Sequence, residues 1–152
     1  MSTLSIATTA IPGSLPEKLE QISAAGFQTI ELTEADFIGF QGSIEDVHRL
    51  LEKTKLKINL FQAFYDFEGL NGEQRKQSLS GLESKISLVK ALGADLLLVC
   101  SSCHPDASGD ENIISADLLE LANKAEKHNL SIAYLALPWA RHIQTEMQAL
   151  EL

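Results

Sequence analysis

The sequence has few basic residues and few cysteines for its length. Its 152 residues include 12 Lys and Arg against 21 Asp and Glu, which gives a formal net charge of −9 at pH 7. An acidic chain is repelled by nucleic acid and by anionic membrane surfaces, so we expect neither as a partner. Two cysteines in a chain of this length are too few for a disulfide framework.

Long apolar runs and phosphate-binding glycine motifs are also absent. No stretch approaches the roughly 18 consecutive apolar residues of a transmembrane helix. The opening segment MSTLSIATTAIPG has no basic region of the kind that begins a secretory signal, which makes the cytoplasm the expected location. No GxGxxG or GxxxxGK[ST] motif opens a predicted helix, so nucleotide-binding folds lose their usual support. We assign residues 1–152 to a single domain, the normal count for this length.

Short apolar runs alternate with helical patterns along the whole chain. A capping box at Ser14 and Glu17 opens the first helix, Gly26 ends it, and Ser43 caps the second. The predicted helices lie at 14–26, from 43 onward, at about 73–92, across a segment that carries Leu118 and ends at Asn129, and from about 142. The predicted strands lie at 4–8, 26–32, 56–61, 93–100 and 130–137. Strands that alternate with helices in this way predict a parallel sheet with right-handed crossovers.

Two architectures fit five such units. One is a flavodoxin-like doubly wound open sheet, with helices on both faces. The other is the first part of a (β/α)8 barrel, which typically needs about 250 residues. Periodicity alone does not distinguish them.

Four motifs resemble a known family. The segments SIATTAIPGSLPEKLEQISAAGFQTIEL, LFQAFYDFEG, LGADLLLVCSS and IAYLALPWARH are similar, in order and spacing, to the 3-dehydroshikimate dehydratases of quinate and shikimate catabolism. These enzymes belong to the xylose-isomerase-like TIM barrels. The resemblance runs along nearly the whole chain but covers only the N-terminal half, or slightly more, of a family catalytic domain. It implies a parallel (βα)5 partial TIM barrel and a lyase that converts 3-dehydroshikimate to protocatechuate.

The resemblance also implies a divalent cation (Mg, Mn or Co) held by side chains from the ends of the last four strands. Its first ligand is a glutamate in a segment that typically reads YEALAWGRH. Here the segment reads YLALPWARH, so Leu135 occupies the ligand position. The other ligands are expected beyond residue 152. An alkyl side chain cannot coordinate a hard cation, so we expect no metal ligand and no cofactor in this chain.

Several residues still match the family pattern. The resemblance places Gln62, Arg141 and His142 near the substrate, with His142 as the candidate catalytic residue. The alternative for His142 is a polar residue that opens the last helix. Trp139 is expected to pack against the end of the sheet.

The loop after the third strand differs from the family pattern. Where family members read FQPFRDFEG, this chain has Ala63 and Tyr65, so a basic group that could hold the substrate carboxylate is absent. Asp66 and Glu68 match the family, but they could equally be ordinary loop carboxylates or charges at a helix N-terminus.

The segment CSSCH, from Cys100 to His104, offers a different function. C-x-x-C-H is the attachment pattern of c-type haem, and C-x-x-C alone is typical of a redox dithiol. A redox pair normally opens a helix, whereas here Pro105 and the run SGDEN follow. The interpretation we favour is a buried strand residue, Cys100, and a loop thiol, Cys103.

These observations leave three hypotheses. The first is the N-terminal part of a dehydratase-like barrel, inactive as an isolated chain. The second is half of an active enzyme, completed for a small-molecule substrate by another copy or by a separate C-terminal half. The third is a redox or binding module built on the CxxC segment.

The handedness of the crossovers adds an expectation about assembly. If the strands lie in sequential order, every helix covers the same face of the sheet. The other face, which includes Ala133, Leu135 and Leu137, is then uncovered, while Ile132, Tyr134 and Ala136 face the helices. An apolar face of that kind predicts self-association or a missing C-terminal half.

Overall fold

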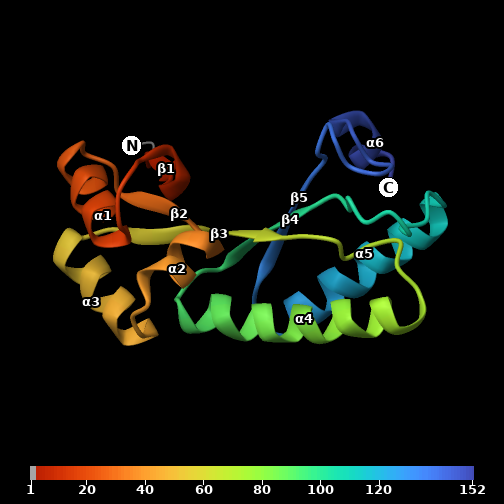
Figure 1. Ribbon diagram of the computed structural model, residues 1–152, viewed down its shortest axis with the longest axis horizontal. Coiled ribbons are helices and arrows are strands. Elements are labelled where there is room, and N and C mark those ends of the chain that lie inside the picture. Colours follow the sequence, from red (N-terminus) through yellow and green to blue (C-terminus); the bar gives the residue numbers. More distant parts are fainter. Residues whose placement is uncertain (1–2) are drawn as a thin grey trace.

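Five parallel strands lie side by side in the order in which they occur in the sequence. The computed structural model describes residues 3–152. Its sheet runs β1-β2-β3-β4-β5, with every neighbouring pair parallel (Figure 1). The strands are β1 (Ser5–Ala7), β2 (Thr29–Thr33), β3 (Lys57–Phe64), β4 (Leu96–Cys100) and β5 (Ser131–Leu135). A flavodoxin-like sheet would place its second strand at the edge, next to the first, and its third on the first strand's other side. The observed order therefore confirms the partial barrel.

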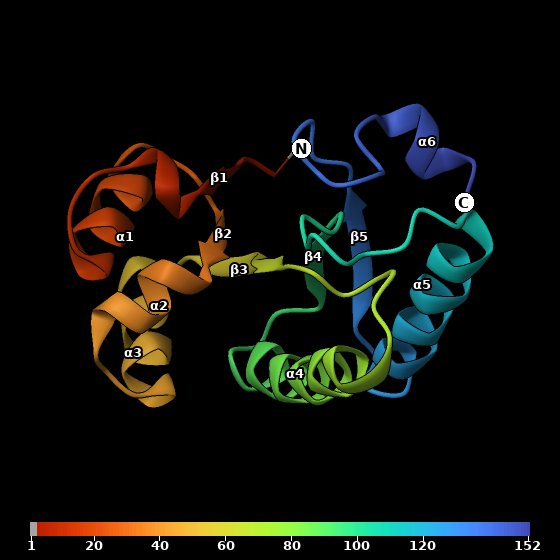
Figure 2. The ribbon, with the colours of Figure 1, turned by 45° about the vertical axis from the view of Figure 1, so that its right-hand side comes forward.

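The helices surround the outer side of this sheet. They are α1 (Leu15–Ala24), α2 (Glu34–Phe40), α3 (Ile44–Thr54), α4 (Gly72–Ala91), α5 (Glu111–Glu126) and α6 (Glu146–Leu150), and a short 3-10 helix spans Thr8–Ala10. Figure 2 shows the strands along an arc, with α1, α3, α4 and α5 outside it. This one-sided arrangement is what right-handed crossovers between sequential strands produce. None of the helices in the described part of the chain is long and apolar enough to cross a membrane.

The main hydrophobic core lies between the sheet and these helices. Its largest fully buried side chains include Phe61 of β3, Leu32 of β2 and Leu97 of β4. Helices α1 and α4 contribute Leu19 and Ile86 from their inward stripes. On β5, Ile132 and Tyr134 pack against the same core, as the alternation along this strand predicts.

The structure differs from the predicted helices in two places. The last helix does not start near His142 but at Glu146, because Thr145 caps it by accepting a hydrogen bond from the backbone N–H of Gln148. A short helix, α2, follows β2 directly and was not predicted. Its cap is Thr33, the last residue of β2, whose hydroxyl accepts from the N–H of Asp36.

No helix within residues 3–152 covers the inner face of the sheet, and this face carries both polar and apolar side chains (Figure 2). By strand register, Glu31 lies beside Leu60, and Cys100 lies beside Leu135. Polar groups occupy this face on β2 and β3, whereas β4 and β5 present leucines, of which Leu135 is 39% exposed. The uncovered face is therefore apolar over β4 and β5, but not over its whole width as the sequence predicts.

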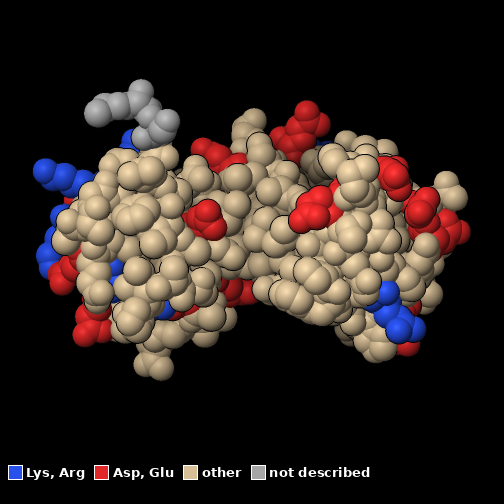
Figure 3. Space-filling model, turned by 90° about the horizontal axis from the view of Figure 1, so that it is seen from above, with Lys and Arg blue, Asp and Glu red and all other residues tan. Residues whose placement is uncertain are grey.

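One broad face of the molecule carries scattered acidic residues among uncharged ones. Figure 3, seen from above in the view of Figure 1, shows Asp and Glu scattered across the face while Lys and Arg lie mostly toward its margins. This face offers no basic patch of the kind that binds phosphate backbones.

Candidate functional site

A register shift in β3 presents Gln62 on the inner face. The pairing of β3 with β4 is irregular between Gln62 and Phe64. Phe61 and Phe64 both pack under the helices, while Gln62 lies between them on the other side. Its side-chain Nε2 donates a 3.1 Å hydrogen bond to Glu31 Oε2 of β2. The amide is thereby oriented, with its carbonyl oxygen left to accept another donor.

Gln62 lines a hollow at the carboxyl ends of the first strands. This hollow, of about 380 Å³, has walls of Thr9, Thr33, Glu34, Ala35, Ile38, Gln62, Ala63 and Tyr65. Its volume is within the usual range for small-molecule sites. The carboxyl ends of parallel strands are where (β/α) barrels bind their ligands. We call it the β1–β3 hollow below.

Two residues set the polarity of the β1–β3 hollow. Glu34, the first residue of α2, pairs through Oε1 with Lys85 of α4. Tyr65 is 56% exposed, and its partial burial, with a smaller contribution from the charge of Glu34, raises the pKa of its phenol. The phenol of Tyr65 is thus a neutral donor and acceptor at physiological pH.

The loop after β3 is fastened to the loop after β4 by two carboxylates. Asp66 Oδ1 accepts hydrogen bonds from the Cys103 N–H at 2.8 Å and from the Ser102 hydroxyl at 3.2 Å. Glu68 Oε1 accepts from the Ser102 N–H at 2.5 Å and from the Tyr134 phenol at 2.9 Å. The two carboxylates therefore hold adjacent strand ends together, which favours the loop interpretation of both residues.

Glu68 is the most buried carboxylate of the site. It is 2% exposed, and its Oε2 has no hydrogen-bond partner among residues 3–152. Burial raises its pKa more than the hydrogen bonds from Ser102 and Tyr134 lower it. Burial, together with the nearby charge of Glu68 and the hydrogen bond to it, likewise raises the pKa of Tyr134.

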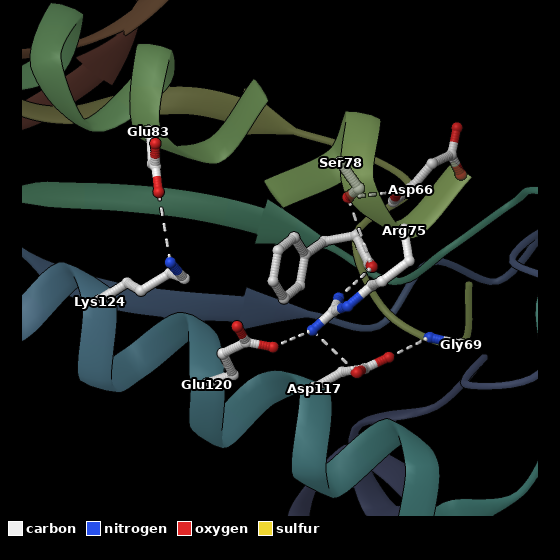
Figure 4. A network of polar contacts seen from close by, with 9 residues as sticks. Asp66, Gly69, Arg75, Ser78, Glu83, Asp117, Glu120 and Lys124 are labelled. Carbon is white, nitrogen blue, oxygen red and sulfur yellow. Dashed lines mark hydrogen bonds and ion pairs between the residues drawn. The ribbon is translucent and has the colours of Figure 1, made fainter. Parts of the chain in front are cut away.

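Arg75 of α4 holds the same loop from its outer side (Figure 4). Its guanidinium contacts Asp117 at 2.9 Å and Glu120 at 2.6 Å, both on α5, and donates to the Phe67 carbonyl at 3.0 Å. It also lies over the Phe67 ring, 4.5 Å from the centroid. Asp117 in turn accepts from the Gly69 N–H at 2.8 Å. This network is structural and lies away from the β1–β3 hollow.

Arg141 and His142 occupy the loop that follows β5. His142 Nε2 lies 2.8 Å from the Ala107 carbonyl, which can only accept, so Nε2 carries the proton. The imidazole packs so closely on Gly109 that a Cβ there would lie 2.7 Å from Nδ1 and would displace the ring. Arg141 is exposed, and its backbone N–H donates to the Ser102 carbonyl at 2.8 Å.

The structure therefore does not gather all the predicted substrate-binding residues in one place. Gln62 lines the β1–β3 hollow, but Arg141 and His142 do not, and no hydrogen bond joins them to Gln62 within residues 3–152. Trp139 is 72% exposed, which corrects the expectation that it packs against the sheet. It lies in a turn with Pro138 after β5, which the Ala140 N–H closes by donating to the Leu137 carbonyl.

The two thiols differ in position as the sequence predicts. Cys100 is buried at the end of β4, and burial raises the pKa of its thiol to about 11. Cys103 is exposed in the following loop, and partial desolvation and the charges of Asp66 and Glu68 raise its pKa as well. A raised pKa disfavours the thiolate that disulfide exchange requires.

Leu135 ends β5 on the inner face, in register with Cys100 of β4. No oxygen ligand is available from its side chain. Within residues 3–152, no group of three or more His, Cys, Asp or Glu side chains is placed to hold a metal ion. The residues present therefore do not fit the cation that the resemblance implies.

Sequence reasoning missed two acidic members of the site. Glu31 lies in the middle of β2, where it orients Gln62, and Glu34 begins α2, where it lines the hollow. The signal for Glu34 was the capping pair Thr33 and Asp36, which marks a helix start right after the strand.

Comparison with known proteins places this geometry in a family. The sequence model for the xylose isomerase-like TIM barrel matches residues 19–152. A 3-dehydroshikimate dehydratase of Pseudomonas aeruginosa is 45% identical over 148 residues, which are 97% of this chain and 23% of that protein. The chain thus spans about a quarter of the length of this curated relative.

Solved structures agree with this result. A xylose isomerase-like TIM barrel/4-hydroxyphenylpyruvate dioxygenase fusion protein is 41% identical with a TM-score of 0.94, over 99% of this chain and 24% of that chain. The IolI protein, solved with a zinc atom, is 19% identical with a TM-score of 0.81, over 99% of this chain and 57% of its own. The resemblance to dehydratases is confirmed as homology, and the chain belongs to the xylose isomerase-like TIM barrel family.

Proposed function

We propose that this chain builds the first five βα units of a 3-dehydroshikimate dehydratase-type barrel and forms one wall of its substrate pocket. It supplies no metal ligand at the end of β5, and by itself it forms no protocatechuate. The observation that carries the proposal is the leucine at position 135, on the inner face where the dehydratase pattern has a ligand glutamate.

The chemistry of the reaction explains why a leucine at this position would prevent activity. Loss of water from 3-dehydroshikimate needs a base for the proton beside the carbonyl and stabilisation of the charge that develops on the oxygen. In the dehydratases a divalent cation supplies that stabilisation. Leu135 offers no oxygen to such a cation, and Glu68, the nearest buried carboxylate to β5, is already bonded to Ser102 and Tyr134. The chain retains Gln62 and His142 as candidate substrate contacts.

A second chain that completes the barrel is the alternative function. It is favoured by the edges of the sheet, because within residues 3–152 β1 pairs only with β2 and β5 only with β4. An unpaired parallel edge beside an uncovered inner face is suited to receive further βα units.

Complementation with a separate polypeptide tests the proposal. We would express this chain alone and together with the barrel segment of the P. aeruginosa relative that follows the matched region. Each would be assayed with Leu135 and with Leu135→Glu for conversion of 3-dehydroshikimate in the presence of Mn²⁺. We expect protocatechuate only from Leu135→Glu together with the added segment.

A matched control adds a carboxylate elsewhere on the same face of the same strand, as Ala133→Glu. It should not restore turnover in the mixture, because Ala133 lies deeper in β5, away from its carboxyl end. Turnover by the unaltered chain alone would contradict the proposal. Turnover by the unaltered chain with the added segment would support the two-chain alternative. It would also show that Leu135 is not what prevents activity.

A further inference from the structure

A second hollow lies at the opposite end of the sheet, where β3 begins. Its volume is about 580 Å³, which is within the usual range for small-molecule sites. The carboxyl ends of α3 and α4 form its walls, and Figures 1 and 2 both show these helices next to one another under β3. We call it the amino-end hollow.

The floor of the amino-end hollow is aliphatic. It is made by four side chains of the main hydrophobic core, Leu51, Leu56, Ile58 and Leu92. His48 of α3 joins the two helical walls, because its Nε2 lies 2.9 Å from the Ala91 carbonyl of α4, which can only accept a hydrogen bond. The hollow therefore presents an apolar surface between two helices that are bonded to each other, and a hydrocarbon group fits such a surface.

Lys55 occupies a turn at which other helices of the chain have glycine or asparagine. Helices α1, α4 and α5 are followed by Gly26, Gly93 and Asn129, each with a positive φ. Helix α3 ends in the same turn, where Lys55 has a φ of 57° and the N–H groups of Lys55 and Leu56 donate to carbonyls of the last helical turn. Glycine and asparagine adopt this conformation at lower cost than lysine does, so the turn itself does not call for a charged side chain.

The charges at the rim do not balance. The exposed residues Lys55 and Lys57 line the hollow, and neither forms an ion pair within residues 3–152. Of the acidic residues in the lining, Asp95 is paired with Lys90, whereas Glu52 forms no ion pair within the same residues. Two unpaired ammonium groups thus face one unpaired carboxylate, and one negative charge on a ligand would balance them.

We propose that the amino-end hollow binds a small monoanion with a hydrocarbon body. The body lies on the aliphatic floor, and the negative charge lies at the rim beside Lys55 and Lys57. The site is at the amino-terminal end of β3, whereas the β1–β3 hollow is at the carboxyl ends of the strands. The inference therefore does not depend on the proposed function.

The test is a titration with three compounds that share one carbon skeleton and differ in charge. They are cyclohexanecarboxylate, cyclohexylmethanol and the cyclohexylmethylammonium ion. In the isotope-labelled chain, the backbone amide signals of Leu56, Gly93 and Asp95 report on the amino-end hollow, and those of Leu98 and Leu135 report on the inner face of the sheet. We expect the carboxylate to shift the first set of signals and to bind about fivefold more tightly than the alcohol, with the ammonium compound weakest.

Two double variants remove the same charge from different places. Lys55→Asn with Lys57→Gln should abolish the preference for the carboxylate while the alcohol still binds, and asparagine retains the left-handed turn. The control, Lys53→Gln with Lys76→Gln, removes two lysines that form surface ion pairs elsewhere, and it should keep the preference. Lys57→Gln alone leaves the turn of α3 unaltered and should lower the preference in the same direction, which keeps the test decisive if Lys55→Asn disturbs the turn.

Binding of the alcohol or the ammonium compound as tightly as the carboxylate would overturn the inference. An equal loss of preference in the control would overturn it too, because the attraction would then not arise at the rim. Shifts confined to Leu98 and Leu135, or no shifts at all, would have the same consequence. The complementation assay follows turnover at the other end of the strands, so failure of one proposal leaves the other measurable.

Discussion

The phenol of Tyr134 on β5 donates a 2.9 Å hydrogen bond to the buried carboxylate of Glu68, which lies in the loop after β3. This contact spans two strand positions and passes over the end of β4, where Ser102 binds the same oxygen. Three consecutive strand ends are thereby held in fixed relation. The arrangement depends on a carboxyl group that is nearly removed from solvent.

The first prediction concerns the pH dependence that Glu68 confers. Its pKa is raised in the folded chain by burial, and Asp66 adds to the shift, so the folded state binds the proton more tightly than the unfolded state does. The stabilisation from protonation is complete below the unfolded pKa and is lost as the pH rises through the folded pKa. Cys100, Cys103 and Tyr134, which also face this carboxyl group, stay neutral across this range.

Glu68→Gln removes this titration. The unfolding free energy of the original chain should therefore increase relative to that of Glu68→Gln as the pH is lowered from about 7.5 to about 5. Urea denaturation of both proteins at the two pH values measures the difference, in which the titration of carboxyl groups that do not interact with Glu68 cancels. A difference that is independent of pH, or that changes in the opposite direction, would refute the prediction.

The second prediction concerns Arg75. Arg75 and Asp117 are each only 14% exposed, so replacing the arginine leaves a shielded carboxylate without its partner. Arg75→Met should lower the free energy of unfolding by about 2 kcal/mol. The control is Lys76→Met, since Lys76 pairs with Glu73 at the surface, and no measurable change is expected. Equal effects of the two substitutions in urea denaturation would show that the Arg75 network contributes nothing beyond a surface pair.

The third prediction concerns assembly. Leucines of β4 and β5 on the inner face are uncovered, so we expect the chain to self-associate in a concentration-dependent way. Leu135→Lys should weaken this association, whereas Leu150→Lys on α6 should not, although Leu150 is 79% exposed. Sedimentation equilibrium measures both. A monomer that persists at high concentration in the unaltered chain would contradict the prediction.

The fold was predictable because its signals are local. Ser14 with Glu17 and Ser43 with Asp46 mark helix starts through bonds made within three residues, and both are present. Local signals do not distinguish a barrel from an open sheet, because both folds have the same alternation of strands and helices. The motifs shared with the family favoured the barrel, and the sequential strand order confirms it.

The site was less predictable because its contacts join distant segments. Gln62 and Glu31 are separated by 31 residues, and only the register of β2 against β3 brings them together. The start of α6 was misplaced because His142 is polar like a cap residue, yet its ring is held by the loop after β4. The exposed position of Trp139 depends on the turn at Pro138, and aromatic character alone does not reveal it.

The most direct test of the account is the equilibrium binding of a divalent cation by the chain itself. The chain and Leu135→Glu would each be dialysed against Mn²⁺ and analysed for bound metal. We expect neither to retain a stoichiometric ion, because a single added carboxylate leaves a hard cation mostly hydrated. One tightly held ion per unaltered chain would contradict the central claim that this part of the barrel carries no metal centre.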